Sequence, residues 1–296
     1  MEKYKEKYLE AFLERAKINM GDLMRVVKDL EKRVRQCYAE NITDVRSDDF
    51  VTMILTDASF IIEFFLRHRF NEWTSEDHIV LKPWLTARMQ QDLILLENQL
   101  PFFIIVKLFD LAFASKPGIP SFVVLTFEYF HAYNKQNMSP RPQLKILHFL
   151  DLLRNFFLPP YNRLPKRKLK TVKHIHGATE LDAVGLKFEV DLSRNCLLDL
   201  DLHLGYKKRV LKIPCFTFDD NTELHVRNLL ALEQCHYPNM TYVTDHFILL
   251  DFLINREEDL DLLRRQGIVV NGFGNKHATN FMGNLGTGII HELQIL

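Results

Sequence analysis

Two aspartates and a glutamate are closely spaced at the start of a predicted helix, and their carboxylates are the strongest candidates for chemistry. Asp219, Asp220 and Glu223 form a D-D-x-x-E pattern. Such carboxylates can bind Mg²⁺, which prefers oxygen ligands, and hold it against a diphosphate in a helical enzyme. The same residues also suit a helix start, where Asp220 caps the first turn and Glu223 reaches back to it. We favour the cap, because metal-binding carboxylates are expected inside a helix that lines a cavity.

Three other patterns suggest metal or phosphate binding and are weaker. Asp199, Asp201 and His203 share one face of a predicted strand, but leucines alternate with them, as on the solvent face of a half-buried sheet. His174 and His176 lack a third ligand of the kind that zinc requires. The glycine-rich residues 283–288 lack the strand–turn–helix unit that surrounds a phosphate loop. We therefore predict no metal site and no cofactor.

Several ionisable side chains stand alone in otherwise apolar helices, and an unpaired buried charge is costly. We therefore expect a buried polar network made of Asp57, Glu97, Asn98, Arg154, Arg227 and Glu233. Glu63 and Asp151 lie in similar surroundings. The alternative for any of these carboxylates, Glu97 in particular, is a catalytic acid–base whose pKa is raised by burial. The sequence leaves both possibilities open.

The elements that position these residues are mainly helices. Apolar side chains recur at helical spacing in residues 2–18, 21–40, 48–70, 83–99, 102–113, 120–134 and 142–157, and again in 179–184, 220–236, 241–254 and 257–266. The helix that ends near Phe70 is apolar nearly all round, so we expect it in the core. Pro101 must interrupt the helical pattern around it, and the amides of Asn98 and Gln99 are placed to satisfy the freed backbone groups.

Between residues 186 and 214 the apolar spacing changes from helical to alternating. Leu186, Phe188 and Val190 form one such run, and the leucines at 198, 200, 202 and 204 form another. This pattern predicts a small antiparallel sheet of two or three strands with one apolar face. The predicted fold is thus mainly α, with this sheet inserted in the C-terminal half.

Prolines and a basic run at residues 158–176 predict an exposed linker, although a nuclear-localisation signal has a similar composition. We accordingly divide one domain, 1–275, into a helical part at 1–157, this linker, and a sheet with helices at 177–275. Residues 276–296 differ in composition and are assigned to an atypical tail.

Composition excludes several function classes. The 38 basic and 38 acidic residues cancel, which argues against a nucleic-acid partner. The four cysteines are widely spaced, as expected for free thiols in a reducing compartment. No apolar run approaches the roughly 18 residues that span a bilayer. We expect the chain as written to be soluble, with the cytoplasmic side favoured.

Several segments resemble a plant family known as domain of unknown function 247. They are DASFIIE at 57–63, KPW at 82–84, DLILLENQLPFF at 92–103, LDLLR at 150–154, ATEL at 178–181, GLKF at 185–188 and ALEQC at 231–235. The resemblance covers about residues 1–275. It implies a plant protein of unknown biochemistry, and it implies a membrane-spanning helix in a longer C-terminal part. This chain departs from the pattern at both ends, so we expect it to be truncated there and to lack that segment.

The resemblance and the lack of a complete catalytic pattern favour a non-enzymatic interaction or signalling protein. Its partner is predicted to be another, unidentified protein, and its full-length relatives are expected to be membrane-anchored. The alternative is a helical, metal-dependent enzyme that uses Asp219, Asp220 and Glu223.

Overall fold

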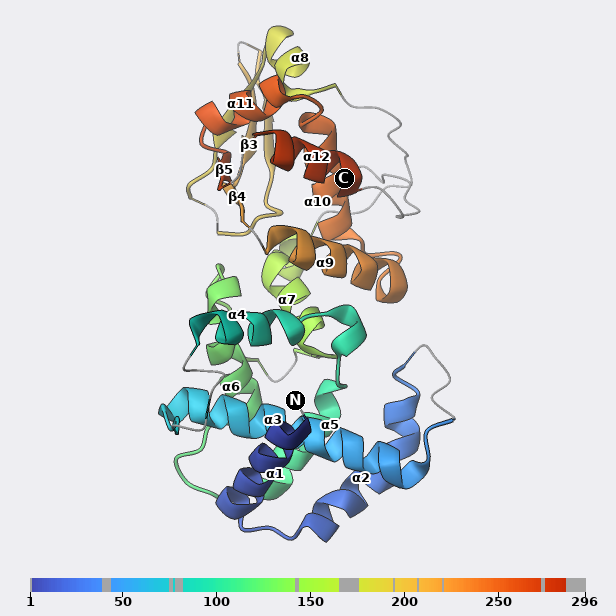
Figure 1. Cartoon of the computed structure of the whole chain (residues 1–296). Coiled ribbons are helices and arrows are strands. Elements are labelled where there is room, and N and C mark those ends of the chain that lie inside the picture. The colour runs from blue at the N-terminus through green and yellow to red at the C-terminus, as the bar shows by residue number, and fades with distance from the viewer. Residues whose placement is uncertain are drawn as a thin grey trace. The chain divides into compact units, whose positions relative to one another are not determined.

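The computed structural model of the protein describes residues 2–38, 44–74, 77, 82–141, 144–164, 176–193, 195–206, 208–219, 221–272 and 275–285. These residues are mainly helical, which confirms the predicted fold class (Figure 1). The chain divides into two compact units. The first contains Met1–Leu93 and Asn98–Leu152, and the second contains Ile94–Glu97 and Leu153–Leu296.

The first unit is built from helices packed around α3. Its elements are α1 (Glu2–Ala16), α2 (Met20–Arg35), α3 (Ser47–Phe70), α4 (Pro83–Asp92), α5 (Phe102–Phe113), α6 (Phe122–Tyr129), the 3₁₀ turn η3 (His131–Tyr133) and the start of α7 (Phe149–Phe157). Because α3 is apolar on nearly every side, helices α1, α2, α5 and α6 all pack against it.

Aromatic rings fill the core of this unit. Phe65 of α3 stacks on Phe122 and on Tyr129, with ring centroids 5.6 and 4.4 Å away. Phe12 of α1 meets Phe113 of α5 edge to face. Offset-stacked and edge-to-face rings attract one another beyond the area they bury, so these pairs hold the helices in a defined arrangement.

The predicted interruption before Pro101 separates α4 from α5. The side-chain amide of Asn98 donates to the carbonyl of Asp92 at 2.9 Å, and that of Gln99 donates to the carbonyl of Leu93 at 2.8 Å. These carbonyls lie at the end of α4, where no further helical turn supplies donors. The amides therefore bind carbonyls at the end of α4, which stops at Asp92 rather than near Gln99 as predicted, and Pro101 instead precedes the first residue of α5.

The second unit combines helices with two small sheets. Its elements are the rest of α7, the 3₁₀ turns η2 (Leu96–Asn98, which extends one residue beyond this unit) and η4 (Tyr161–Arg163), α8 (Ala178–Ala183), β1 (Leu186–Val190), β2 (Asp201–Leu204), β3 (Arg209–Ile213), β4 (Phe216–Phe218), α9 (Thr222–His236), α10 (Tyr242–Leu253), α11 (Glu257–Arg265), β5 (Val269–Asn271) and α12 (Asn275–Leu285). Gly267 follows α11 with φ +72, so the expected glycine ends that helix.

The larger sheet has the strand order β1-β3-β2, and its predicted antiparallel arrangement is only half right. β2 and β3 form an antiparallel hairpin, but β1 pairs with β3 in parallel. Alternating apolar residues reveal which face of a strand is buried, but they do not reveal the order or direction of strands. The parallel pair β4-β5 was not predicted, since each strand has only three residues and its partner is distant in sequence.

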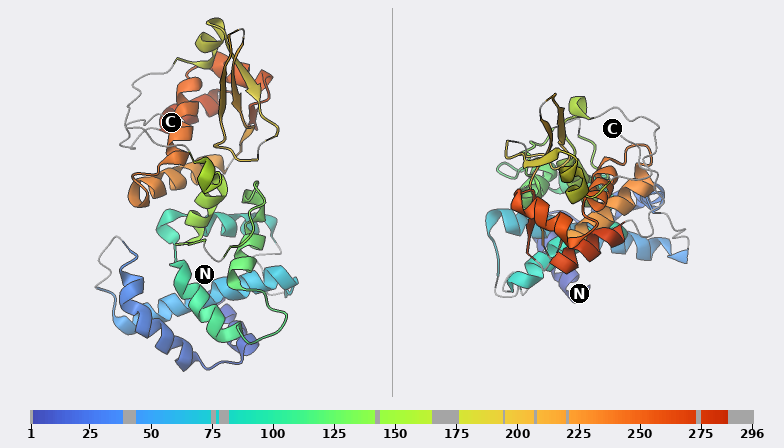
Figure 2. Two further views of the ribbon diagram at one scale, coloured as in Figure 1. Left: turned by 180° about the vertical axis from the view of Figure 1, so that it is seen from behind. Right: turned by 90° about the horizontal axis from the view of Figure 1, so that it is seen from above.

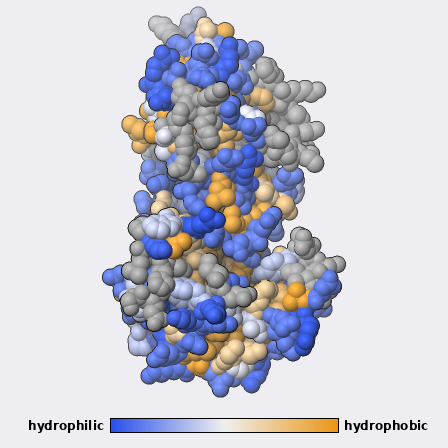
Figure 3. All heavy atoms as spheres, in the orientation of Figure 1, coloured by the Kyte–Doolittle hydropathy of each residue, from blue (hydrophilic) through white to orange (hydrophobic). Residues whose placement is uncertain are grey.

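Helices α10, α11 and α12 lie on one side of the larger sheet (Figure 2). The smaller sheet joins these helices through Phe216 and Phe218, which meet Phe247 of α10 and Phe281 of α12 edge to face. The surfaces visible in Figure 3 are mostly hydrophilic with scattered apolar residues. Most of the predicted linker at 158–176 lies outside the described residues.

Candidate functional site

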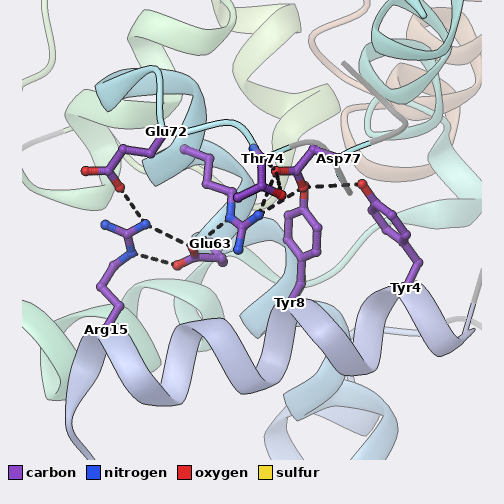
Figure 4. A network of polar contacts seen from close by, with 8 residues as sticks. Tyr4, Tyr8, Arg15, Glu63, Glu72, Thr74 and Asp77 are labelled. Atoms are coloured by element: carbon purple, nitrogen blue, oxygen red, sulfur yellow. Dashed lines mark hydrogen bonds and ion pairs between the residues drawn. The ribbon is translucent and has the colours of Figure 1, made fainter. Parts of the chain in front are cut away.

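The densest cluster of charged side chains in the first unit connects α1 with α3 (Figure 4). Arg15 of α1 donates to both carboxylate oxygens of Glu63, at 2.8 and 3.0 Å. Glu63 also accepts a hydrogen bond from Arg67, one helical turn further along α3, at 2.8 Å. Glu72 completes the coordination of Arg15 at 2.7 Å. One buried carboxylate is thus held between two guanidinium groups.

Asp77 extends this cluster, and both of its carboxylate oxygens are occupied. Arg67 donates to them at 2.9 and 2.8 Å. The hydroxyl of Tyr8 donates at 2.7 Å and that of Tyr4 at 3.3 Å, both from α1. Thr74 contributes its backbone N–H at 2.7 Å and its hydroxyl at 2.9 Å. Six donated hydrogen bonds therefore converge on one carboxylate.

The electrostatics of the cluster favour its charged form. Burial opposes ionisation of Asp77, but the hydrogen bonds from Thr74 and Tyr8 and the charge of Arg67 outweigh it and lower the pKa of Asp77. The hydrogen bond to Glu63 raises the pKa of Arg15. Burial, followed by the hydrogen bond to Asp77, raises the pKa of Tyr8 well above its usual range. These shifts favour an ionised Asp77 and protonated Arg15 and Tyr8.

This arrangement is typical of a structural ion-pair network rather than of a catalytic site. A catalytic carboxylate needs a free oxygen within reach of a substrate, whereas the oxygens of Glu63 and Asp77 are engaged by protein donors. The cluster joins α1 to α3 and to the segment after it. Glu63 stood out in the sequence as a charge in an apolar helix, but Arg15, Arg67 and Asp77 were not predicted to join it. The four-residue spacing of Glu63 and Arg67 is the one local signal that pointed to part of the cluster.

The second unit contains a more deeply buried ion pair, between Arg154 of α7 and Glu233 of α9. The guanidinium Nε lies 2.8 Å from a carboxylate oxygen, and the two side chains are 4% and 0% exposed. The guanidinium of Arg154 also donates to the carbonyl of Met240 and lies over the ring of Tyr237, 4.0 Å from its centroid. The sequence named both members of this pair among its buried charges.

Glu233 has a second role as the N-terminal cap of α10. Its carboxylate accepts hydrogen bonds from the backbone N–H groups of Val243 at 3.2 Å and Thr244 at 2.8 Å, and from the Thr244 hydroxyl at 2.8 Å. The first N–H groups of a helix have no partner within it and carry partial positive charge. The carboxylate of Glu233 in α9 therefore contacts both Arg154 of α7 and the first turn of α10.

The predicted carboxylate cluster does not gather around a common point. Asp219 accepts hydrogen bonds from the backbone of Asn221 at 3.0 Å and the hydroxyl of Thr222 at 2.9 Å, which fold the chain into the start of α9. Glu223 is exposed and pairs with Arg227 one turn along, at 2.8 Å. Asp220 lies outside the described residues. Asp219 therefore serves the helix start, and Glu223 serves a surface ion pair.

The remaining members of the expected network are dispersed. Asp57 pairs with Lys5 of α1 in the first unit. Glu97 and Asn98, in the 3₁₀ turn η2, are both exposed, contrary to the expected burial. Arg227 lies on the solvent face of α9. Of the six residues predicted to share a network, the structure brings only Arg154 and Glu233 together.

The weaker metal candidates are also separated. Asp201 and His203 contact each other at 3.1 Å on the face of the larger sheet opposite Phe188, whereas Asp199 pairs with Arg163. His174 and residues 286–288 lie outside the described residues, and His176 pairs with Glu180 at 2.8 Å. In the described ranges, no three histidine, cysteine or acidic side chains are placed to share a metal ion.

One buried side chain that the sequence did not suggest is His246 of α10. Neither of its ring nitrogens has a hydrogen-bond partner among the described residues, and burial lowers its pKa to about 4. It lines a cavity of about 40 Å³ together with Tyr242, Asp245 and several leucines. A neutral imidazole is the form that such surroundings tolerate.

Comparisons with known proteins identify the family. A family model described as a plant protein of unknown function, DUF247, matches residues 1–294. The chain belongs to the DUF247 family. A UPF0481 protein of Arabidopsis thaliana is 30% identical over 322 residues, in an alignment that covers 99% of this chain and 66% of that relative. No solved structure matches.

The DUF247 match confirms the resemblance and extends through residues 276–294, which the sequence analysis assigned to a tail. This DUF247 chain spans just under two thirds of the length of its Arabidopsis relative. None of the helices in the described part of the chain has the length and apolar character needed to cross a bilayer.

Proposed function

We propose that this DUF247 protein is a non-enzymatic interaction protein whose protein partner binds the outer edge of β2. The observation that carries the proposal is the exposure of apolar side chains at this strand. Leu202, Leu204 and Tyr206 are 53%, 70% and 105% exposed. The strand order leaves β2 at the side of the sheet, with one edge unpaired among the described strands.

The exposed residues gather at one end of the sheet. Leu204, at the end of β2, and Leu186, at the start of β1, are both in register with Arg209. Val184, two residues before β1, is 74% exposed and lies at this same end. Single apolar residues on a surface are ordinary, but adjacent ones beside an unpaired strand are typical of interaction sites.

The placement of the ionisable side chains supports a non-enzymatic role. Glu63, Asp77 and Glu233 are engaged by protein donors on both oxygens. Asp219 folds a helix start and Glu223 pairs with Arg227, so the alternative of a metal-dependent enzyme gains no support from these two carboxylates. These buried carboxylates contribute to packing, which supports the proposal.

The proposal extends to membrane-anchored relatives, in which the β2 edge would bind its partner beside the membrane on the cytoplasmic side. All four cysteines are free thiols, as expected in a reducing compartment. Fractionation of the full-length gene product from plant tissue, with protease treatment of sealed vesicles, tests this part. Recovery of this region on the protease-protected side of inside-out plasma-membrane vesicles would contradict it.

The central test compares two leucine-to-lysine changes at opposite ends of the sheet. Leu204→Lys places a charge at the β2 edge, whereas Leu192→Lys alters a side chain that is 81% exposed beyond the far end of β1. The full-length protein is captured from plant tissue with either change. We expect Leu204→Lys to lose a partner that the unchanged protein and Leu192→Lys retain. Equal capture by both variants would contradict the proposal.

A further inference from the structure

We propose that the partner at the β2 edge is a second copy of this chain, with β2 of each copy paired antiparallel about a two-fold axis at Leu202. This inference rests on the proposed function, since it takes β2 as the binding site and specifies what binds there. Three features of the strand support it: the direction of its backbone groups, the order of its acid and imidazole side chains, and the position of its leucines.

The backbone groups of Leu202 and Leu204 point away from β3. The N–H of Gly205 donates to the carbonyl of Lys208 at 2.9 Å, so these residues form a hydrogen-bonded pair of the hairpin. Hydrogen-bonded and non-bonded pairs alternate along an antiparallel ladder. His203 and Asp201 therefore bond to β3, and the N–H and C=O groups of Leu202 and Leu204 face outward. An edge of this kind is a template for another strand.

The charges on β2 make the strand complementary to itself. In an antiparallel pair centred on Leu202, Asp201 lies opposite the partner's His203, and His203 lies opposite the partner's Asp201. A carboxylate that faces an imidazole N–H across a strand pair can accept a hydrogen bond from it, and such cross-strand pairs stabilise a sheet. Within one chain these two side chains already contact each other at 3.1 Å, which shows that they share a face and can reach each other.

Other registers are less favourable. A centre at Asp201 places the two aspartates directly opposite each other, and a centre at His203 places Asp201 opposite the partner's Gly205. A shift of one strand by a single residue places its leucine face opposite the charged face of its partner. Only the centre at Leu202 combines two acid–imidazole pairs with a leucine pair on the opposite face.

The leucines supply the apolar part of the interface. Leu202 and Leu204 lie on the face that carries Phe188 and Ile213, but the two leucines are exposed whereas Phe188 and Ile213 are buried. Pairing places Leu202 against its own copy and removes its exposed surface from water. Because β2 has only four residues, we expect a small interface and a reversible dimer.

Charge variants of the purified chain test both the dimer and its register. His203→Asp places aspartates opposite each other, and Asp201→His places histidines opposite each other. We expect each variant alone to dimerise about tenfold more weakly than the unchanged chain, since two attractive pairs are lost. When the two variants are mixed, each aspartate again faces a histidine, so dimerisation should return. Sedimentation equilibrium measures the dimer, and circular dichroism checks that each variant is folded.

The outcomes separate this inference from the proposed function. A chain that stays monomeric at every concentration, or variants that do not recover on mixing, overturn the self-pairing. Binding of the monomer to vesicles of anionic phospholipid through Leu204 overturns it as well. If the chain is monomeric but Leu204→Lys still loses a different protein partner, the self-pairing fails and the proposed function stands. If Leu204→Lys changes neither dimerisation nor capture, both fail.

Discussion

Arg154 and Glu233 are 79 residues apart in the sequence and 2.8 Å apart in the structure, with both side chains almost fully buried. Their contact joins α7 to α9, and the same carboxylate caps α10. An ion pair removed from water stabilises a fold only when both charges are well matched and further hydrogen bonds satisfy their remaining atoms. Hydrogen bonds from Val243 and Thr244 engage the Glu233 carboxylate, although burial outweighs them and the charge of Arg154 and raises the pKa of Glu233.

We predict that breaking this pair from one side is more costly than removing it entirely. Glu233→Leu leaves the buried guanidinium of Arg154 without its carboxylate. Arg154→Met leaves the buried carboxylate of Glu233 without its guanidinium. Each is expected to lower the free energy of unfolding by about 3–5 kcal/mol. The double variant should lose less than the sum of the two, with a remaining cost of about 1 kcal/mol for the lost cap of α10.

The measurement is urea denaturation followed by far-UV circular dichroism. Glu223→Leu is a matched control, because Glu223 occupies the same helix in an exposed ion pair, and surface pairs contribute little. Additive losses in the double variant would contradict the predicted coupling between Arg154 and Glu233.

A second prediction concerns Asp77 and acid. Asp77→Asn is expected to lower the stability of the first unit by about 2–3 kcal/mol at neutral pH, because charged hydrogen bonds are lost. The folded pKa of Asp77 lies below its ordinary value of 3.8, so this stabilisation is present above that pH and is lost as the pH falls through the folded pKa. The difference in unfolding free energy between Asp77→Asn and the unchanged protein should therefore shrink below pH 3.8.

Tryptophan fluorescence measures this difference selectively. Trp73 and Trp84 are the only two tryptophans of the chain, and both belong to the first unit. Trp73 contacts the ring of Phe64, so its emission reports the packing of α3. A difference in stability between Asp77→Asn and the unchanged protein that stays constant down to the lowest pH would contradict the assigned direction of the pKa shift.

A third prediction follows from His246. Burial lowers its pKa from 6.5 to about 4, so the unfolded chain binds a proton in this window and the folded chain does not. Stability contributed by the neutral imidazole is therefore lost as the pH falls from 6.5 toward 4, by about 3 kcal/mol in full. His246→Leu should remove this dependence, which is measured as the difference between the two chains at matched pH. If the stability of His246→Leu and that of the unchanged protein fall equally with pH, the prediction is wrong.

A fourth prediction compares two glutamates. Glu97 is exposed, so Glu97→Leu is expected to change stability by no more than about 0.5 kcal/mol. Glu63 is buried between Arg15 and Arg67, so Glu63→Leu should lower stability by about 3–5 kcal/mol. Thermal unfolding of both variants distinguishes them. A large loss for Glu97→Leu would indicate a buried partner that the structure does not give it.

Whether a feature could be predicted from the sequence depends on how far apart in the chain the interacting residues lie. Pro101 and Gly267 act on the backbone within a few residues: α5 begins directly after Pro101 and Gly267 follows α11 as predicted, whereas α4 ends at Asp92, earlier than predicted. The direction of β1 relative to β3 was predicted wrongly, since pairing between segments about twenty residues apart is not encoded in the spacing of either. Burial of Glu97 was likewise inferred from its apolar neighbours in sequence, but its side chain is exposed in the 3₁₀ turn η2.

The sequence by itself determined that this protein is mainly helical, where most of its helices lie, and to which family it belongs. Helical periodicity, caps and breaks are local, so residue types and spacing are sufficient to predict them. Only the tertiary structure decided that Arg154 meets Glu233, that Asp77 collects donors from two tyrosines of α1, and that β2 is left at an edge. These contacts depend on how elements distant in sequence pack, because a charge is paired by what lies near it in space.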